Sequence, residues 1–165
     1  MNEEKKYINL KNKTNVLKLY LRTEEGKETG EFLEFNLKDI ELVGRYDEMM
    51  TKLQKNDEWL QNQKVIINKQ QDFKNKNNFM TNNQKMLYEV TKEYLKRQTE
   101  TFNMFLGDNG VQKLLNGGTF DIDSIMIIRD YIQEQILPYL NITKENITKE
   151  IKEKYKINVK EEVLE

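Results

Sequence analysis

The sequence predicts a mainly α protein of the α+β class, in which an N-terminal β-hairpin precedes a bundle of about four to five amphipathic helices. Two observations support this prediction. Apolar and polar residues alternate over residues 15–37, as in strands, whereas apolar residues recur every three or four positions over much of the remaining chain. The 165 residues are 37% hydrophobic and 33% charged, which is enough apolar material for one domain with a buried core.

Two short alternating runs form the predicted hairpin, residues 15–22 and 31–37. Between them lies TEEGKETG, whose glycines and polar residues are typical of a turn. An isolated hairpin is marginally stable in water, so its apolar face should pack on the helices that follow. The residues expected on that face are Leu17, Leu19, Leu21, Leu33, Phe35 and Leu37.

A long helix is expected to begin after Lys38. Its apolar stripe recurs at helical spacing and comprises Ile40, Val43, Tyr46, Met50 and Leu53. The pattern extends toward Ile67 and then gives way to residues 69–84, where Asn, Gln and Lys dominate. We expect that segment to be a mobile loop.

A second long helix is expected to start at Thr81, because Thr81 and Gln84 have the spacing of a capping box. The polar residue Gln98 interrupts its apolar stripe. The members of that stripe are Leu87, Val90, Tyr94, Phe102 and Phe105.

The stretch FLGDNGVQKLLNGG, residues 105–118, follows this helix and contains four of the seven glycines. It lacks the Lys-Ser/Thr of a phosphate loop and the alternating acidic ligands of a calcium loop. We therefore interpret it as a helical corner, with Gly107 as the C-cap of the preceding helix. Asp108 or Asn109 would cap a short helix over residues 111–116. The glycines expected to be structural turn residues are Gly107, Gly110 and Gly117.

Two further helices complete the predicted bundle. Asp121 or Asp123 would cap a helix that stops or kinks near Pro138, and Thr143 would open a last, mixed-charge helix. The expected buried residues of the first are Ile125, Ile128, Ile132 and Ile136. This divides the chain into an N-terminal arm (1–14), a single domain (15–140) and a C-terminal helix and tail (141–165).

The composition argues against an enzyme. The chain contains no Cys and no His, which removes the commonest nucleophile activator and metal ligand, and Ser124 is its only serine. No pair of carboxylates has a spacing that marks it as catalytic. We expect no catalytic residues, no metal site and no cofactor. The charged start and the absence of a long apolar run predict a cytoplasmic protein without a membrane span.

Charge is distributed unevenly along the chain. Residues 61–98 carry eight Lys or Arg against three Asp or Glu, and residues 100–140 carry two against six. This pattern would suit head-to-tail homo-oligomers, or would simply reflect two solvated faces. The basic run includes Phe73 and Phe79, so a nucleic-acid-binding regulator is one alternative function. The net charge of −1 argues against that alternative.

Two motifs carry a family resemblance. The first runs from a strand end into a helix and comprises Phe35, Leu37, Asp39, Arg45 and Tyr46; the second is the corner with Gly107, Gly110 and Gly117. Together they resemble the tail assembly chaperones of long-tailed phages and prophages of low-GC Gram-positive bacteria. Leu106 and Asn116 stand where that family prefers Phe. The resemblance covers about half of the chain in two short motifs.

The resemblance implies a non-enzymatic chaperone of the host cytoplasm, which binds the tape-measure protein and helps recruit tail tube subunits. A structural tail or neck component of the phage particle is an alternative. The partner-facing patch expected at the corner comprises Phe105, Leu106, Leu114, Leu115 and Phe120. The other interpretation of these residues is that they form the core of the corner.

Overall fold

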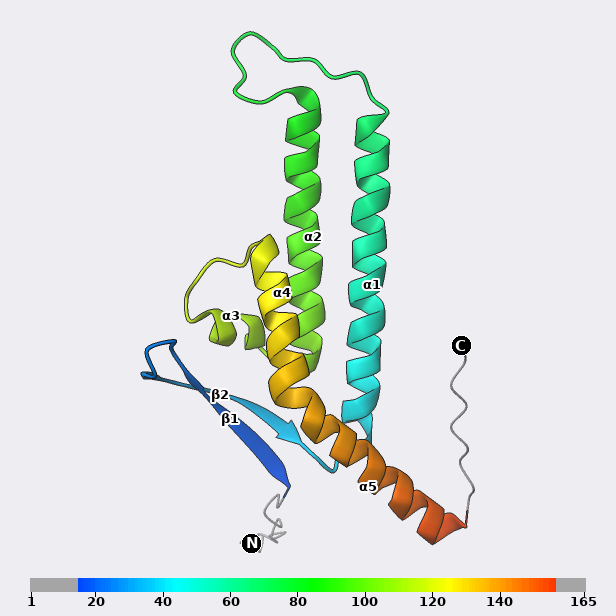
Figure 1. Cartoon of the computed structure of the whole chain (residues 1–165). Helices are drawn as coiled ribbons and strands as arrows, with labels where there is room; N and C mark the ends of the chain where they lie inside the picture. Colours follow the sequence, from blue (N-terminus) through cyan, green and yellow to red (C-terminus); the bar gives the residue numbers. More distant parts are fainter. Residues whose placement is uncertain (1–14, 157–165) are drawn as a thin grey trace, which may run out of the picture.

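The computed structural model describes residues 15–156 (Figure 1). The expected arm (1–14) and the last part of the expected tail (157–165) lie outside the described residues. Strands β1 (Val16–Arg22) and β2 (Glu28–Asn36) form an antiparallel two-stranded sheet, and helices make up most of the remainder, which confirms the predicted α+β class. The helices are α1 (Ile40–Asn68), α2 (Asn82–Leu106), α3 (Gly110–Leu115), α4 (Ile122–Tyr131), the π-helical turn η1 (Ile132–Ile136) and α5 (Leu137–Tyr155).

The β-hairpin has the alternation expected from the sequence. Leu17 lies opposite Phe35 and Leu19 lies opposite Leu33, and the side chains of Leu33 and Phe35 are buried in the core. Tyr20 is exposed on the opposite side, where its ring centroid lies 5.8 Å from that of Phe32. One apolar face therefore packs against the helices, as a two-stranded sheet requires for stability.

Helices α1 and α2 form a long antiparallel hairpin (Figure 1). Asp39 caps α1 by accepting a hydrogen bond from the backbone N–H of Glu41, and this bond lowers the pKa of the Asp39 carboxyl. The predicted capping box at the start of α2 is present, because Thr81 and Gln84 each accept a bond from the other's backbone N–H.

The buried side of α1 differs from the expected one. Leu42, Met49 and Leu53 are buried, whereas Ile40 and Met50 are exposed. The sequence contains two overlapping helical stripes, and the one that begins at Leu42 is buried in the core. On α2 the expected stripe is wrong at two positions. Leu87 is exposed, and Gln98, which was expected to interrupt the buried face, is itself fully buried.

The segment between α1 and α2 is a loop, but it ends at Thr81 rather than at residue 84, because Asn82 begins α2. Hydrogen bonds of two side chains, Asp72 and Asn83, connect the loop to the end of α1 and the start of α2. One carboxylate oxygen of Asp72 accepts from the backbone N–H groups of Phe73 and Asn83, both at 2.9 Å. The side-chain amide of Asn83 donates to the carbonyl oxygens of Ile67 and Gln70.

The C-terminal helices form one helical run without a break. Asp121 and Ser124 make a capping box at the start of α4, and the four expected isoleucines of α4 and η1 are buried. The run does not stop at Pro138, which lies directly after the π-helical turn η1 and begins the first turn of α5. The expectation that Thr143 opens a separate helix is wrong, since Thr143 is buried within α5.

Candidate protein-interaction site

The glycine-rich corner lies at the base of the bundle, where α2, α3 and the β-hairpin meet. The ring of Phe105 packs between two aromatic rings of the first motif, with centroids 5.5 Å from Phe35 and 5.6 Å from Tyr46. In addition, Arg45 donates to Asp39 at 2.9 Å within the first motif. The two stretches that carry the resemblance therefore build one shared core.

The backbone of the corner depends on its glycines. Gly107 ends α2 with φ 93° and ψ 176°, a conformation outside the left-handed helical region and open essentially to glycine alone. Gly110 begins α3 so close to α2 that an added Cβ would lie 2.4 Å from the Cβ of Leu106. Asn116 and Gly117 both have positive φ and turn the chain out of α3.

The N-terminus of α3 is capped by a residue of α2 and not by the loop residues expected to cap it. Neither Asp108 nor Asn109 caps it: Asn109, in the cap position, is left-handed and makes no side-chain cap bond. Instead, the side-chain oxygen of Asn103, on α2, accepts from the backbone N–H of Val111 at 2.9 Å. Sequence spacing could not identify this cap, because Asn103 lies eight residues before its donor and reaches it only once the corner has folded.

The five residues expected to face a partner lie at different depths. Phe105 and Leu106 are buried in the core. Leu114, Leu115 and Phe120 are half-buried and pack against the core from outside. Of the five, Leu114 also lines a groove on the surface.

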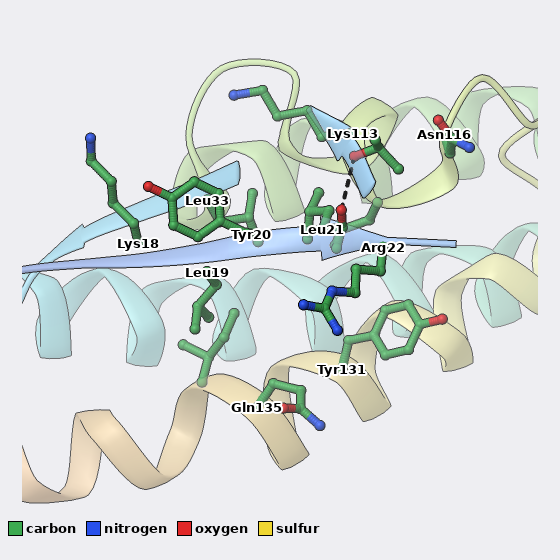
Figure 2. A pocket seen from close by; sticks show the side chains of 13 residues that line it. Lys18, Leu19, Tyr20, Leu21, Arg22, Leu33, Lys113, Asn116, Tyr131 and Gln135 are labelled. Carbon is green, nitrogen blue, oxygen red and sulfur yellow. Dashed lines mark hydrogen bonds between the residues drawn. The ribbon is translucent and has the colours of Figure 1, made fainter. Parts of the chain in front are cut away.

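This groove has a volume of about 530 Å³ and lies between β1, α3 and the helical turn at η1 (Figure 2). Its apolar lining comprises Leu19, Leu21, Leu33, Leu114 and Ile136. Polar side chains surround it, contributed by Lys18, Arg22, Lys113, Tyr131 and Gln135. The combination of apolar lining and polar margin is typical of sites that accept apolar side chains.

The groove follows β1. Residues 18–22 of β1 all line it, together with Thr29 and Leu33 of β2. Within residues 15–156, β1 pairs with β2 alone, which leaves its second edge without a neighbouring strand. A partner could therefore use backbone hydrogen bonds at this edge as well as apolar contacts.

A polar cluster joins α1, α2 and α4: Tyr94 and Gln98 are buried, and Asp57 and Arg129 are half-buried. The Tyr94 hydroxyl and the Gln98 amide both donate to Asp57, at 2.6 and 3.1 Å, and Arg129 donates to the other carboxylate oxygen at 3.1 Å. Burial, followed by the bond to Asp57, raises the pKa of the Tyr94 hydroxyl. These groups bond mainly to one another, so the cluster fixes the register of three helices.

Other features bear on what the chain could bind. Within residues 15–156, no group of three or more Asp, Glu, His or Cys is placed to hold a metal ion. None of the helices in this part of the chain combines the length and apolar character that a bilayer span needs. Comparison with protein-family models, curated proteins and solved structures finds no match to this chain.

Proposed function

We propose that this protein is a non-enzymatic protein-binding chaperone, and that it acts in phage tail assembly by binding the tape-measure protein and helping to recruit tail tube subunits in the host cytoplasm. The groove beside β1 is the observation that supports a binding function, because its apolar lining includes a strand that pairs with β2 alone among residues 15–156. The two sequence motifs support the more specific assignment.

The size of the groove suits transient binding. A volume of about 530 Å³ holds a few apolar side chains, and each contributes roughly 1.5–3 kcal/mol on full burial. Association offsets much of this gain through lost translational, rotational and side-chain freedom. An assembly chaperone must release its partner when the tube forms, and moderate affinity meets that need.

A matched pair of variants tests the groove. Gln133 and Gln135 are both exposed on η1, but only Gln135 lines the groove. We expect Gln135→Trp to fill the groove and weaken binding of purified tape-measure fragments by roughly tenfold or more, measured by calorimetry. Gln133→Trp should bind as the unchanged protein does. Absence of tape-measure binding by the unchanged protein, or equal affinity of the two variants, would contradict the proposal.

The composition of phage particles separates a chaperone from a structural component. A chaperone leaves the tail as it forms, so mass spectrometry of purified virions should not detect the chain. Its presence in stoichiometric amount would instead support a tail or neck protein. For the nucleic-acid alternative, DNA or RNA binding that falls with salt and is lost on replacing Lys69, Lys74 and Lys76 would be the supporting result.

A further inference from the structure

The distal end of the α1–α2 hairpin, residues 64–88, extends beyond the elements that pack around its base (Figure 1). We refer to these residues as the tip. Phe79 is 95% exposed, and several other large apolar side chains of the tip are exposed too: Val65, Ile66, Phe73, Leu87 and Tyr88. Exposed apolar side chains that gather at one end of a molecule indicate a contact with another molecule.

The tip is also basic. It contains five lysines and one acidic residue, Asp72, whose carboxylate is occupied by backbone N–H groups of the loop. Within the described part of the chain, none of these lysines forms an ion pair. The lysines are Lys64, Lys69, Lys74, Lys76 and Lys85.

The outer side of α4 has the opposite charge. Ile122, Met126 and Ile127 are exposed there, at 60%, 58% and 45%. Asp123 and Asp130 are exposed at helical positions between these apolar residues, and Glu134 follows on η1. We refer to these six residues as the α4 face.

No cation on α4 neutralises this face. Residues 114–143 contain no lysine, and their only arginine, Arg129, is paired with Asp57 between the helices. No ion pair among residues 15–156 involves the three carboxylates of the α4 face. Elsewhere on the helical hairpin, charges pair locally, as between Lys52 and Glu48 or Arg97 and Glu93.

We propose that copies of this chain associate head to tail, with the basic apolar tip of one copy docked on the acidic apolar α4 face of the next. The two surfaces match in charge and both offer apolar contact, so each supplies what the other lacks. Because they are different surfaces of the chain, each added copy leaves one tip and one α4 face free. Such an interface is heterologous and produces open chains or rings.

The proposal rests on these two surfaces and does not depend on the function proposed above. Its electrostatic part predicts that association weakens with salt. We expect sedimentation velocity of the purified full chain to show growth with protein concentration, stronger at about 50 mM than at about 500 mM salt.

Two double variants test the pairing of the surfaces. Lys76→Glu with Phe79→Asp alters only the tip, and Met126→Lys with Asp130→Lys alters only the α4 face. All four side chains are exposed, so both variants should fold, which circular dichroism checks. Each variant alone should associate roughly tenfold or more weakly than the unchanged chain. Ile142→Lys, at an exposed apolar position on α5, is the matched control and should leave association unchanged.

Mixing the two double variants gives the decisive result. The tip variant keeps its α4 face and the face variant keeps its tip, so an equal mixture should form heterodimers through these two unaltered surfaces. A mixture that stays monomeric would overturn the proposal, as would an unchanged chain that is monomeric at every concentration and salt. Tape-measure binding by the Gln135 and Gln133 variants is measured separately, so failure of one proposal leaves the other standing.

Discussion

The two ends of the α1–α2 hairpin differ in the burial of their apolar side chains, although the same two helices form both ends. At the base, Leu42 and Phe102 are buried beneath the β-hairpin and the C-terminal helices. At the tip, Phe73 and Phe79 are exposed to solvent. Two helices bury only the narrow seam between them, and apolar residues outside that seam need a third element. The base has such elements, and none of the elements within residues 15–156 covers the tip.

The largest difference between the two ends should be in core stability. Phe102 is fully buried, so Phe102→Ala should lower the free energy of unfolding by about 3–5 kcal/mol. Phe79→Ala at the tip should change it by no more than about 0.5 kcal/mol. Chemical denaturation measured under conditions that keep the chain monomeric gives both values. A comparable loss for Phe79→Ala would mean that the tip is packed within the monomer.

Loss of a hydrogen bond to the polar residues between α1 and α2 should have the next largest effect on the free energy of unfolding. The side-chain amide of Asn56 donates to Gln98 at 3.0 Å and to Thr101 at 3.2 Å, and both acceptor residues are buried. Asn56→Ala leaves these acceptors without that donor and should cost about 1–3 kcal/mol of unfolding free energy. Gln54→Ala, two residues earlier and on the exposed side of α1, is the control and should be nearly neutral. Equal losses for Asn56→Ala and Gln54→Ala would mean that the hydrogen bonds of Asn56 do not stabilise the fold.

A smaller effect is expected from the glycines of the base. Gly107→Val forces a β-branched residue to φ 93° and should destabilise the fold by about 1 kcal/mol or more. Gly44 is helical, exposed and has open space at its Cβ position, so Gly44→Ala should stabilise α1 by up to about 1 kcal/mol. Thermal unfolding of both variants should shift in opposite directions. If the Gly107→Val protein were as stable as the unchanged one, the corner would not require glycine at this position.

The smallest expected effect is the loss, at low pH, of the hydrogen bonds that Asp72 accepts in the loop of the tip. The backbone N–H of Asn83 and further hydrogen bonds hold the pKa of Asp72 below its ordinary value of 3.8. A lowered pKa means that Asp72 stabilises the loop above the unfolded-state value, and that this contribution is lost as pH falls through the lower folded-state value. The amide resonances of Phe73 and Asn83 should therefore shift together in an acid titration followed by NMR. Asp72→Asn should abolish that shared transition, and its persistence would assign it to another group.

Local signals in the sequence determined much of the secondary structure. Alternation fixed the inward face of the β-hairpin, the Thr81–Gln84 spacing located the start of α2, and the regular isoleucines marked the buried side of α4. These predictions succeed because each depends on groups within a few residues of one another, so the geometry follows from the backbone itself.

The tertiary structure decided the features that depend on residues far apart in the chain. Packing of the assembled core buried Leu42 and left Ile40 exposed, and folding of the corner brought Asn103 to the N-terminus of α3. The groove beside β1 and the exposed tip likewise follow from where the elements lie, not from any one segment. The physical reason is that burial is a property of neighbours: an apolar stripe specifies that a face should be covered, and only the assembled fold specifies which face is covered and which is left for a partner.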